Sequence, residues 1–390
     1  MAIFLIVKHV NPTMAKPKLT IMPDKAQHVE ITSPNDLALK KLCELLRVLA
    51  NDLEFPTADG EYPWPQPQLD LCAQYGVFKW FFEEQYGGFG WSEHDLTLGY
   101  LALSAACQTT TFIITQRAGA CRHIALSGND YVQNELIPDL LSGSHFSTVG
   151  ISHLTTSHRH LAQPVLRAEE TEKGFVLNGF SPWVTGAVQA DTIMVGAQLE
   201  DGRQILTVVP TNIPGVKTET PAHLVAFSSS HTSRVNFEEA EVDGKWLLAG
   251  PIENVMAQGT GARTGGRQTS TLAIGLAGAA IDFITAESEN RPNIIPPVTA
   301  LGNEWSELRG VLLASVAGEE TCGIEELRQR CNNLVLRATQ ASLSVAKGTG
   351  FVTGHPAGRW CCEALFFMVW SCPQSVMNAQ LCQLARIPSE

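Results

Sequence analysis

Few side chains in this sequence have the types and spacing that could catalyse a reaction or bind a metal by themselves. Ten cysteines are scattered among apolar neighbours without a CxxC pair, so they supply no zinc ligand set. His158-Arg159-His160 could bind a metal or a phosphate, although two histidines at this spacing on a loop are more typical of a solvated turn. Arg263 and Arg267 stand at the start of an expected helix, where they could bind an anion or form salt bridges. The sequence therefore predicts no metal site.

The charge balance argues against nucleic acid as a partner. Lys and Arg number 27 against 39 Asp and Glu, which gives a net charge of -12, whereas binding to a phosphate backbone needs clustered basic residues. A hydrophobic content of 44% with 17% charged residues is typical of a folded protein. The length of 390 residues suggests two or three domains.

The start of the chain and the cysteines predict a cytoplasmic protein. The apolar run from Ala2 to Val7 is far too short for a membrane span, and it has no cleavage-like flank of a secretory signal. Scattered cysteines with apolar neighbours are typical of buried, reduced thiols in a reducing compartment. We therefore expect no membrane span.

Three patterns of apolar residues follow one another along the chain. Ser33-Pro34-Asn35-Asp36 predicts a helix start, and helical spacing continues to about residue 144. Over residues 145–250 the period changes to two, with β-branched residues and turns such as Glu172-Lys173-Gly174. Helical spacing then returns. We expect an α+β multi-domain chain with an N-terminal extension (1–32), an N-terminal helical domain (33–144), a middle antiparallel β-sandwich or barrel (145–250) and a C-terminal four-helix bundle (251–390).

Long helices joined by short loops predict the C-terminal bundle. Ser270 to Glu289 is rich in Gly and Ala, which permits close helix packing. Leu301 to Ala317, Ile324 to Lys347 and Arg359 to Leu384 are expected as the helices that follow.

This order of elements, together with three local strings, resembles the acyl-CoA dehydrogenase superfamily of flavoproteins over about residues 35–385. The string from Glu83 to Gly90 is similar to the family's Glu-Tyr-Gly-Gly-Leu-Gly loop. Asn178 to Thr185 is similar to its Asn-Gly segment that ends in Trp-Ile-Thr, and Ala273 to Asp282 matches the Gly/Ala-rich first helix of its bundle. The resemblance implies an oxidoreductase with the family's helix, β-domain and bundle architecture.

The resemblance also implies FAD, bound between the β domain and the bundle and often completed by a neighbouring subunit of a homotetramer or homodimer. Trp183 offers a flat apolar face for the isoalloxazine ring. Thr185, two residues further along the same strand, can donate a hydrogen bond toward flavin N5. The alternative is that Trp183 is a core aromatic of the β domain.

Other cofactor-binding positions of the family are only partly matched in this sequence. Ser152 takes the place of a family threonine and Ser157 that of a serine, although an ordinary hydroxyl-rich turn is the alternative. Arg291 matches an arginine that contacts the pyrophosphate or adenine end of the cofactor, which suits its two-pronged guanidinium. Gly348 and Gly350 are a remnant of a glycine-rich turn that lets backbone N–H groups approach phosphate.

The family's catalytic glutamate is missing. It removes a proton from an acyl thioester and lies in a Tyr-Glu-Gly-Thr string beyond a Pro-x-x-Arg motif. Pro356-Ala357-Gly358-Arg359 sets the register here, and counting forward places Ser371 at the glutamate position. A minority of the family carries the base near the positions of Gly265 and Gly266, again without a carboxylate here. Serine lacks a pKa near neutrality, so the catalytic base is left unassigned.

Three functions remain open. The first is acyl-CoA dehydrogenase-like oxidation of a CH–CH bond in an acyl-CoA or similar small molecule, with an electron acceptor and with Glu363 or His355 as a displaced base. Glu363 is expected on the same helix as Ser371, about 12 Å away, which favours a structural role. The second is the flavin-dependent monooxygenase branch, which uses oxygen, lacks the glutamate and often has His-Asp-Pro where Ser371-Cys372-Pro373 stands here. The third is a scaffold that binds a flavin or another ligand without chemistry.

Overall fold

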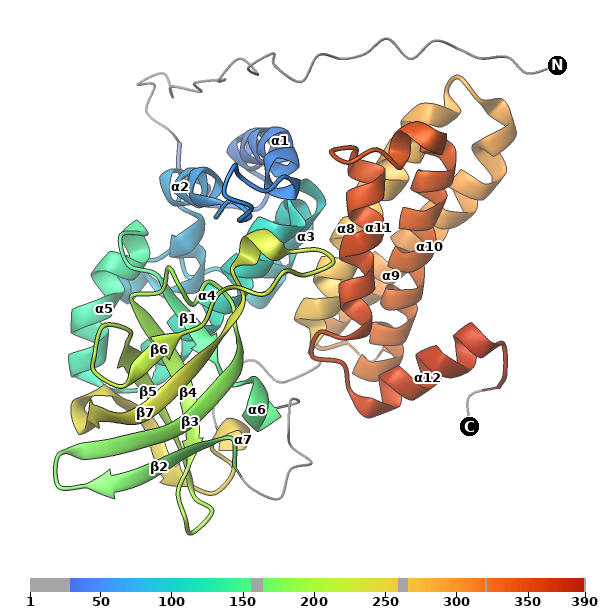
Figure 1. Cartoon of the computed structure of the whole chain (residues 1–390). Coiled ribbons are helices and arrows are strands. Elements are labelled where there is room, and N and C mark those ends of the chain that lie inside the picture. The colour runs from blue at the N-terminus through green and yellow to red at the C-terminus, as the bar shows by residue number, and fades with distance from the viewer. Residues whose placement is uncertain (1–28, 156–163, 259–265, 320, 389–390) are drawn as a thin grey trace.

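The computed structural model describes residues 29–155, 164–258, 266–319 and 321–388. Most of the expected N-terminal extension, the string His158-Arg159-His160 and Arg263 lie outside these ranges. The chain forms a helical N-terminal block, a central sheet and a C-terminal helical bundle, as Figure 1 shows, which confirms the expected order of elements. The N-terminal block contains α1 (Leu37–Ala50), α2 (Gln66–Gln74), α3 (Glu93–Ala106), α4 (Gln108–Leu126) and α5 (Asp130–Ser142).

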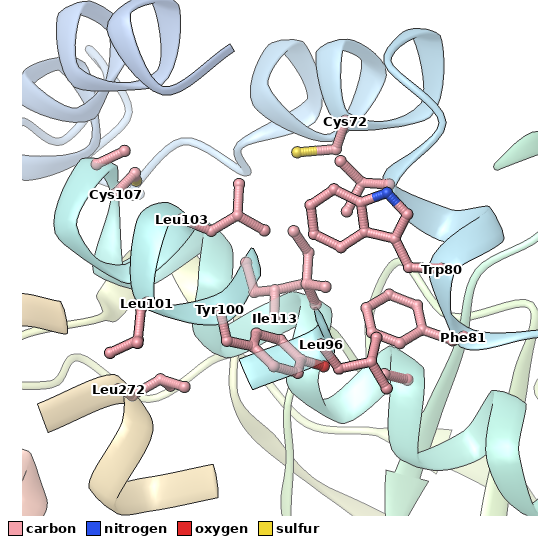
Figure 2. Packing of buried hydrophobic residues seen from close by; sticks show 14 of the residues in the cluster. Cys72, Trp80, Phe81, Leu96, Tyr100, Leu101, Leu103, Cys107, Ile113 and Leu272 are labelled. Carbon is pink, nitrogen blue, oxygen red and sulfur yellow. The ribbon is translucent and has the colours of Figure 1, made fainter. Parts of the chain in front are cut away.

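Aromatic side chains fix the packing of this block. Trp80 stacks on Trp91 with ring centroids 4.1 Å apart, and its indole nitrogen donates to the carbonyl of Ile31 at 3.0 Å. Figure 2 shows Trp80 among the side chains of α3 and α4, with Leu272 of the C-terminal bundle beside Leu101. The N-terminal block and the bundle therefore share one hydrophobic core.

The central sheet is mostly antiparallel, as expected, but it also contains parallel strand pairs and is therefore mixed. Its strand order is β6-β7-β3-β2-β4-β5-β8, and β1 pairs with β4 outside this path. The pairs β1–β4 and β2–β4 are parallel, and the other pairs are antiparallel. The strands are β1 (Ser147–Gly150), β2 (Leu166–Thr171), β3 (Gly174–Val184), β4 (Thr192–Gln198), β5 (Gln204–Pro210), β6 (Val216–Thr218), β7 (Ser233–Asp243) and β8 (Leu247–Ile252).

The neighbouring strands β4 and β5 are buried on both faces. Met194 belongs to the core shared with the helices, whereas its neighbours Ile193 and Val195 belong to a second core on the other face. Leu206 and Ile205 divide in the same way. Because successive side chains of a strand point to opposite faces, an apolar residue at each position places the sheet between two cores. A sheet covered on both faces explains why the parallel pairs are tolerated here.

The bundle contains α8 (Arg267–Ser288), α9 (Ile295–Val316), α10 (Ile324–Gly350), α11 (Pro356–Leu365) and α12 (Gln374–Ala385). The first four lie side by side, and α12 turns away across their end (Figure 1). The expected single helix from Arg359 to Leu384 is wrong, because the 3-10 turn η7 (Phe366–Met368) and a loop interrupt it. Ser371 in that loop has a φ of 45°, which a continuing helix does not allow. Two short helices, α6 (Ser152–Thr155) and α7 (Val255–Gln258), flank the sheet.

One helix of the described residues, α8, is long and apolar enough to cross a membrane. However, 78% of its apolar stretch is buried within the protein, as expected of a core helix.

We predict that Gly275→Ala destabilises the contact between α8 and α3. A methyl group at Gly275 would lie 2.8 Å from both the Leu101 carbonyl oxygen and Ser104 Cβ. Overpacking of this kind costs about 1–3 kcal/mol in the free energy of unfolding, measured by urea denaturation. Gly302→Ala is the matched control, because no atom lies within 4 Å of the added methyl group and alanine raises helix stability by about 0.5–1 kcal/mol. Equal effects of the two substitutions would contradict close packing at Gly275.

Candidate functional site

A cavity of about 610 Å³ lies where the N-terminal block, the sheet and the bundle meet. It has the size of a small-molecule site. The residues of its wall come from α4, from β1 and β3, from the loop before η4 (Ser228–Ser230), from the start of α8 and from the segment after α11. Of the residues singled out in the sequence, the wall includes Ser152, Trp183, Thr185, Gly266 and Ser371.

Close contact between β1 and β3 brings Ser152 to the same cavity as Trp183 and Thr185. A Cβ at Gly150 would lie 2.9 Å from Ser181 Oγ, so glycine lets the end of β1 approach β3. Ser152 follows β1 at the first position of α6, and Trp183 stands at the end of β3. Thr185 follows the strand in a turn, and the pairing of β3 with β7 is irregular between Ser181 and Val184, so the expected place of Thr185 on the same strand as Trp183 is wrong. Both residues nevertheless line the cavity. The Trp183 side chain is 52% exposed, which is unusual for an indole in a folded domain and rules out the alternative of a core aromatic.

The Thr185 hydroxyl belongs to a short chain of buried hydroxyl groups. Its Oγ1 lies 3.2 Å from Thr232 Oγ1, which in turn lies 2.8 Å from Ser230 Oγ. Either atom of each pair can be the donor. If Ser230 donates to Thr232 and Thr232 donates to Thr185, the Thr185 proton is available to a hydrogen-bond acceptor in the cavity.

One face of α4 forms another part of the wall. Phe112, Gln116, Gly119 and His123 recur at three- and four-residue spacing and all line the cavity. Phe227 reaches the cavity from the loop before η4 and has a φ of 67°. That loop is closed by a serine: Leu224 N donates to Ser228 Oγ at 2.9 Å, and Ser228 Oγ donates to the Leu224 carbonyl at 3.0 Å.

Arg328 of α10 holds the segment that carries Ser371. Its guanidinium donates to the carbonyl of Phe367 at 3.1 Å and to that of Trp370 at 2.8 Å, and also to the hydroxyl of Thr269 at the start of α8. Asn332 Nδ2 donates to the same Phe367 carbonyl at 3.0 Å. Arg328 is fully buried, and no carboxylate pairs with it within the described residues. Burial lowers the pKa of Arg328 to about 10, which leaves it charged at neutral pH.

The cavity wall carries no charged side chain among the described residues: Asp, Glu, Lys and Arg are all absent from it. Two titratable groups line it, and burial favours the neutral form of each. Burial, helped by Arg122, lowers the pKa of His123, and burial raises the pKa of the Cys362 thiol. The wall is therefore uncharged near neutral pH.

Other predicted cofactor residues lie away from this cavity. The Arg291 guanidinium donates to the Val345 carbonyl at 2.7 Å and pairs with Glu287 at 3.1 Å. Gly348 and Gly350 are near it at the end of α10. Because α8 has 22 residues, Arg291 lies about 33 Å along the bundle from the start of α8, where the cavity is. Ser157 lies outside the described residues.

Neither displaced base considered from the sequence lines the cavity. Glu363 is 2% exposed, and its Oε1 lies 3.8 Å from Arg359 Nε. Arg359 also donates to Glu54 of the N-terminal block at 3.1 Å. Burial, with a smaller contribution from Glu54, raises the pKa of Glu363 to about 7, although Arg359 opposes this. His355 caps α11, where its Nδ1 accepts a hydrogen bond from Ala357 N at 3.1 Å. Glu363 and His355 therefore contribute to the structure of the bundle and not to the wall of the cavity.

Sequence reasoning missed several residues of the wall. The face of α4 had a usable signal, since residues 112, 115, 116, 119 and 123 follow the helical period. Phe227 had no such signal, because a loop does not indicate what its residues contact. The same holds for Arg328, which lies outside the wall and anchors it from within a helix. Cys362 and Phe366 also line the cavity.

Comparisons with known proteins agree with this architecture. Residues 43–144 match the family described as "Acyl-CoA dehydrogenase, N-terminal domain". The probable acyl-CoA dehydrogenase YngJ of Bacillus subtilis is 25% identical over 260 residues, which cover 65% of this chain and 67% of that protein. Butyryl-CoA dehydrogenase from Megasphaera elsdenii superposes with a TM-score of 0.70 at 16% identity, over 88% of this chain and 97% of that one. KijD3, solved with FMN and a dTDP-linked sugar, superposes with a TM-score of 0.71 at 16% identity, over 90% of this chain and 93% of that one. At such identities the two structures establish the fold.

We predict that Arg328→Met strongly destabilises the protein. The substitution removes the donor of the Trp370 carbonyl and one of the two donors of the Phe367 carbonyl, and leaving a buried acceptor unsatisfied costs about 1–3 kcal/mol in the free energy of unfolding. Arg337→Met is the matched control, because Arg337 lies on the same helix with a 45% exposed side chain paired to Glu304, and an exposed pair contributes about 0–1 kcal/mol. Urea denaturation measures both. Similar losses in the two variants would contradict the anchoring role of Arg328.

We also predict that Glu363→Gln changes how stability depends on pH. The pKa of Glu363 is about 7 in the folded protein and 4.5 in its ordinary state, so unfolding releases a proton between these values and the wild-type stability falls as pH rises through them. Glutamine does not titrate, so the variant does not lose stability in this way. The free energy of unfolding of the variant minus that of the wild type should therefore be about 2–3 kcal/mol larger at pH 8 than at pH 4. Urea denaturation at both pH values tests this, with exposed Glu172→Gln as control. Parallel pH profiles of variant and wild type would refute it.

Proposed function

Because this chain belongs to the acyl-CoA dehydrogenase superfamily, we propose that it is a flavin-dependent oxidoreductase whose flavin ring binds in the cavity against Trp183 and Thr185. FAD is the cofactor that the family implies. One observation carries the proposal: a 52% exposed indole faces a cavity of about 610 Å³ beside a buried hydroxyl. A flat apolar surface next to a single donor suits the isoalloxazine ring.

The cofactor and the residues of the cavity would have different roles in the reaction. A bound flavin supplies the acceptor or donor of hydride and electrons that no side chain here provides. Thr185 orients the ring by donating from its hydroxyl, because Thr232 and Ser230 can supply the hydrogen bonds behind it. Trp183 stacks on the ring, and the apolar wall excludes water.

The phosphate end of the cofactor needs cations that the described cavity wall does not contain. We propose that Arg291 and the turn at Gly348 and Gly350 serve a flavin held mainly by a second copy, in a homodimer or homotetramer. Their distance from the cavity of the same chain supports this arrangement. The Arg291–Glu287 pair at 3.1 Å would have to open or share the guanidinium with phosphate. KijD3 was solved with FMN, so the identity of the extracted flavin is part of the test.

The reaction itself has two candidates. Oxidation of a CH–CH bond in an acyl-CoA is the reaction that the superfamily's dehydrogenases suggest, and it needs a base at the substrate. Ser371 lines the cavity at the glutamate position, and the described wall provides no carboxylate. That observation favours the second candidate, a flavin-dependent monooxygenase that uses oxygen and takes no proton from its substrate through a carboxylate. A scaffold without chemistry would bind a flavin or another ligand and catalyse neither reaction.

The visible absorption spectrum of the purified protein tests the proposal. We expect flavin bands, and we expect Trp183→Leu and Thr185→Val each to lower the bound flavin at least about fivefold, because each removes a contact to the ring. Trp246→Leu is the control, since Trp246 packs against Tyr131 away from the cavity. A colourless protein that takes up neither FAD nor FMN would overturn the proposal.

The same preparation separates the two reactions. Anaerobic bleaching of the flavin by butanoyl-CoA supports dehydrogenation. Incorporation of isotopically labelled oxygen into a product, with reduced flavin and no bleaching by the thioester, supports the monooxygenase.

A further inference from the structure

Four aromatic rings from three segments gather in the cavity wall. Phe112 comes from α4, Phe227 from the loop before η4, and Phe366 and Trp370 from the segment after α11. Phe366 and Trp370 are stacked, with centroids 5.3 Å apart and planes 11° apart. Phe112 meets both edge-on, at 5.0 Å and 5.2 Å, and Phe227 lies 4.8 Å from Phe366. They form one aromatic wall.

The segments that carry these rings are held in place by hydrogen bonds and by helix packing. Arg328 binds the carbonyls of Phe367 and Trp370, so the turn that carries Phe366 and Trp370 is anchored to α10. Ser228 closes the loop that presents Phe227. Phe112 belongs to a buried helix face. A wall of rings with fixed orientation binds a ligand of matching shape with little loss of side-chain entropy.

The chemistry of the surrounding wall limits the ligand further. The described wall has no ionised side chain that could pair with a ligand charge, and burying an unpaired charge is costly. Gln116 and Ser371 lie on the wall as neutral hydrogen-bonding groups. The group that enters this part of the cavity is therefore neutral, with few polar substituents.

We propose that the aromatic wall is a binding subsite for the planar, uncharged aromatic ring of the substrate. This assignment rests on the proposed function, because it treats the remainder of the cavity as the place of the flavin ring. Aromatic rings gain edge-to-face and offset-stacked contacts with Phe112, Phe366 and Trp370 that a saturated ring or chain of the same area does not gain. The substrate class is thus aromatic, whichever of the two flavin reactions follows.

Two probes of the same carbon skeleton test this subsite: 2-naphthol, which is planar and aromatic, and its saturated analogue decahydro-2-naphthol. Binding of 2-naphthol to the purified full-length protein at pH 7 is followed by its own fluorescence, and decahydro-2-naphthol is measured by displacing it. We expect 2-naphthol to bind about fivefold more tightly than the saturated analogue, and to shift the flavin absorption band.

Substitutions in the aromatic wall test whether the preference for 2-naphthol over its saturated analogue arises there. Phe366→Leu and Trp370→Leu should each bring the ratio of the two dissociation constants close to one, whereas Val369→Ala, an aliphatic position of the same wall, should leave it unchanged. Flavin content and thermal unfolding are recorded for each variant. If one of the two leucine variants does not fold, the other and Phe112→Leu decide.

The outcomes for the subsite and for the proposed function are distinguishable. A flavin-containing protein that binds both probes equally overturns the subsite and leaves the proposed function in place. A flavin-free protein that prefers 2-naphthol, and loses that preference in the leucine variants, supports an aromatic subsite while contradicting the proposed function. Retention of the preference in all leucine variants also overturns the subsite, because binding then occurs elsewhere.

Discussion

Arg328 is a fully buried guanidinium that is held by neutral groups, and the candidate site depends on it. Isolated from water and without a carboxylate partner in the described chain, its charge is stabilised by the carbonyl dipoles of Phe367 and Trp370 and by Thr269 and Asn332. These bonds have the strength of charge-assisted hydrogen bonds in a low-dielectric surrounding. They join α10 to the start of α8 and to the turn after α11, so one side chain behind the cavity fixes two parts of its wall.

The other half of the wall depends on the sheet. Two cores, one on each face of β4 and β5, hold the sheet in place, and the close approach at Gly150 brings the ends of β1 and β3 together. Trp183 therefore projects from a well-packed strand end, and Thr185 from the turn that directly follows it. A site built this way has a polar, hydroxyl-lined side at the sheet and an apolar, aromatic side at the bundle. That division suits a redox ring bound beside a neutral substrate.

Predictions from the sequence succeeded where one period dominated a segment. The helical spacing of α1 follows from burial of one face, and the apolar Gly- and Ala-rich run of α8 follows from burial all round the helix. They failed at the helix expected from Arg359 to Leu384, because apolar residues at Phe366, Phe367 and Val369 keep the helical pattern through the turn. The break became visible only where Arg328 takes up two backbone carbonyls that a helix would have used. The parallel pairs of β1 and β2 with β4 were also missed, since alternation does not report strand direction.

The sequence alone determined most of the element types, the acidic charge balance and the serine at position 371, because each of these is local in the chain. Only the tertiary structure decided which residues share a cavity. It brought Phe112, Phe227 and Trp370 together from three segments, and it separated Arg291 from Trp183 by the length of a helix. Contacts between distant segments depend on how the cores pack and on which buried donors find acceptors, and neither is encoded in a local period.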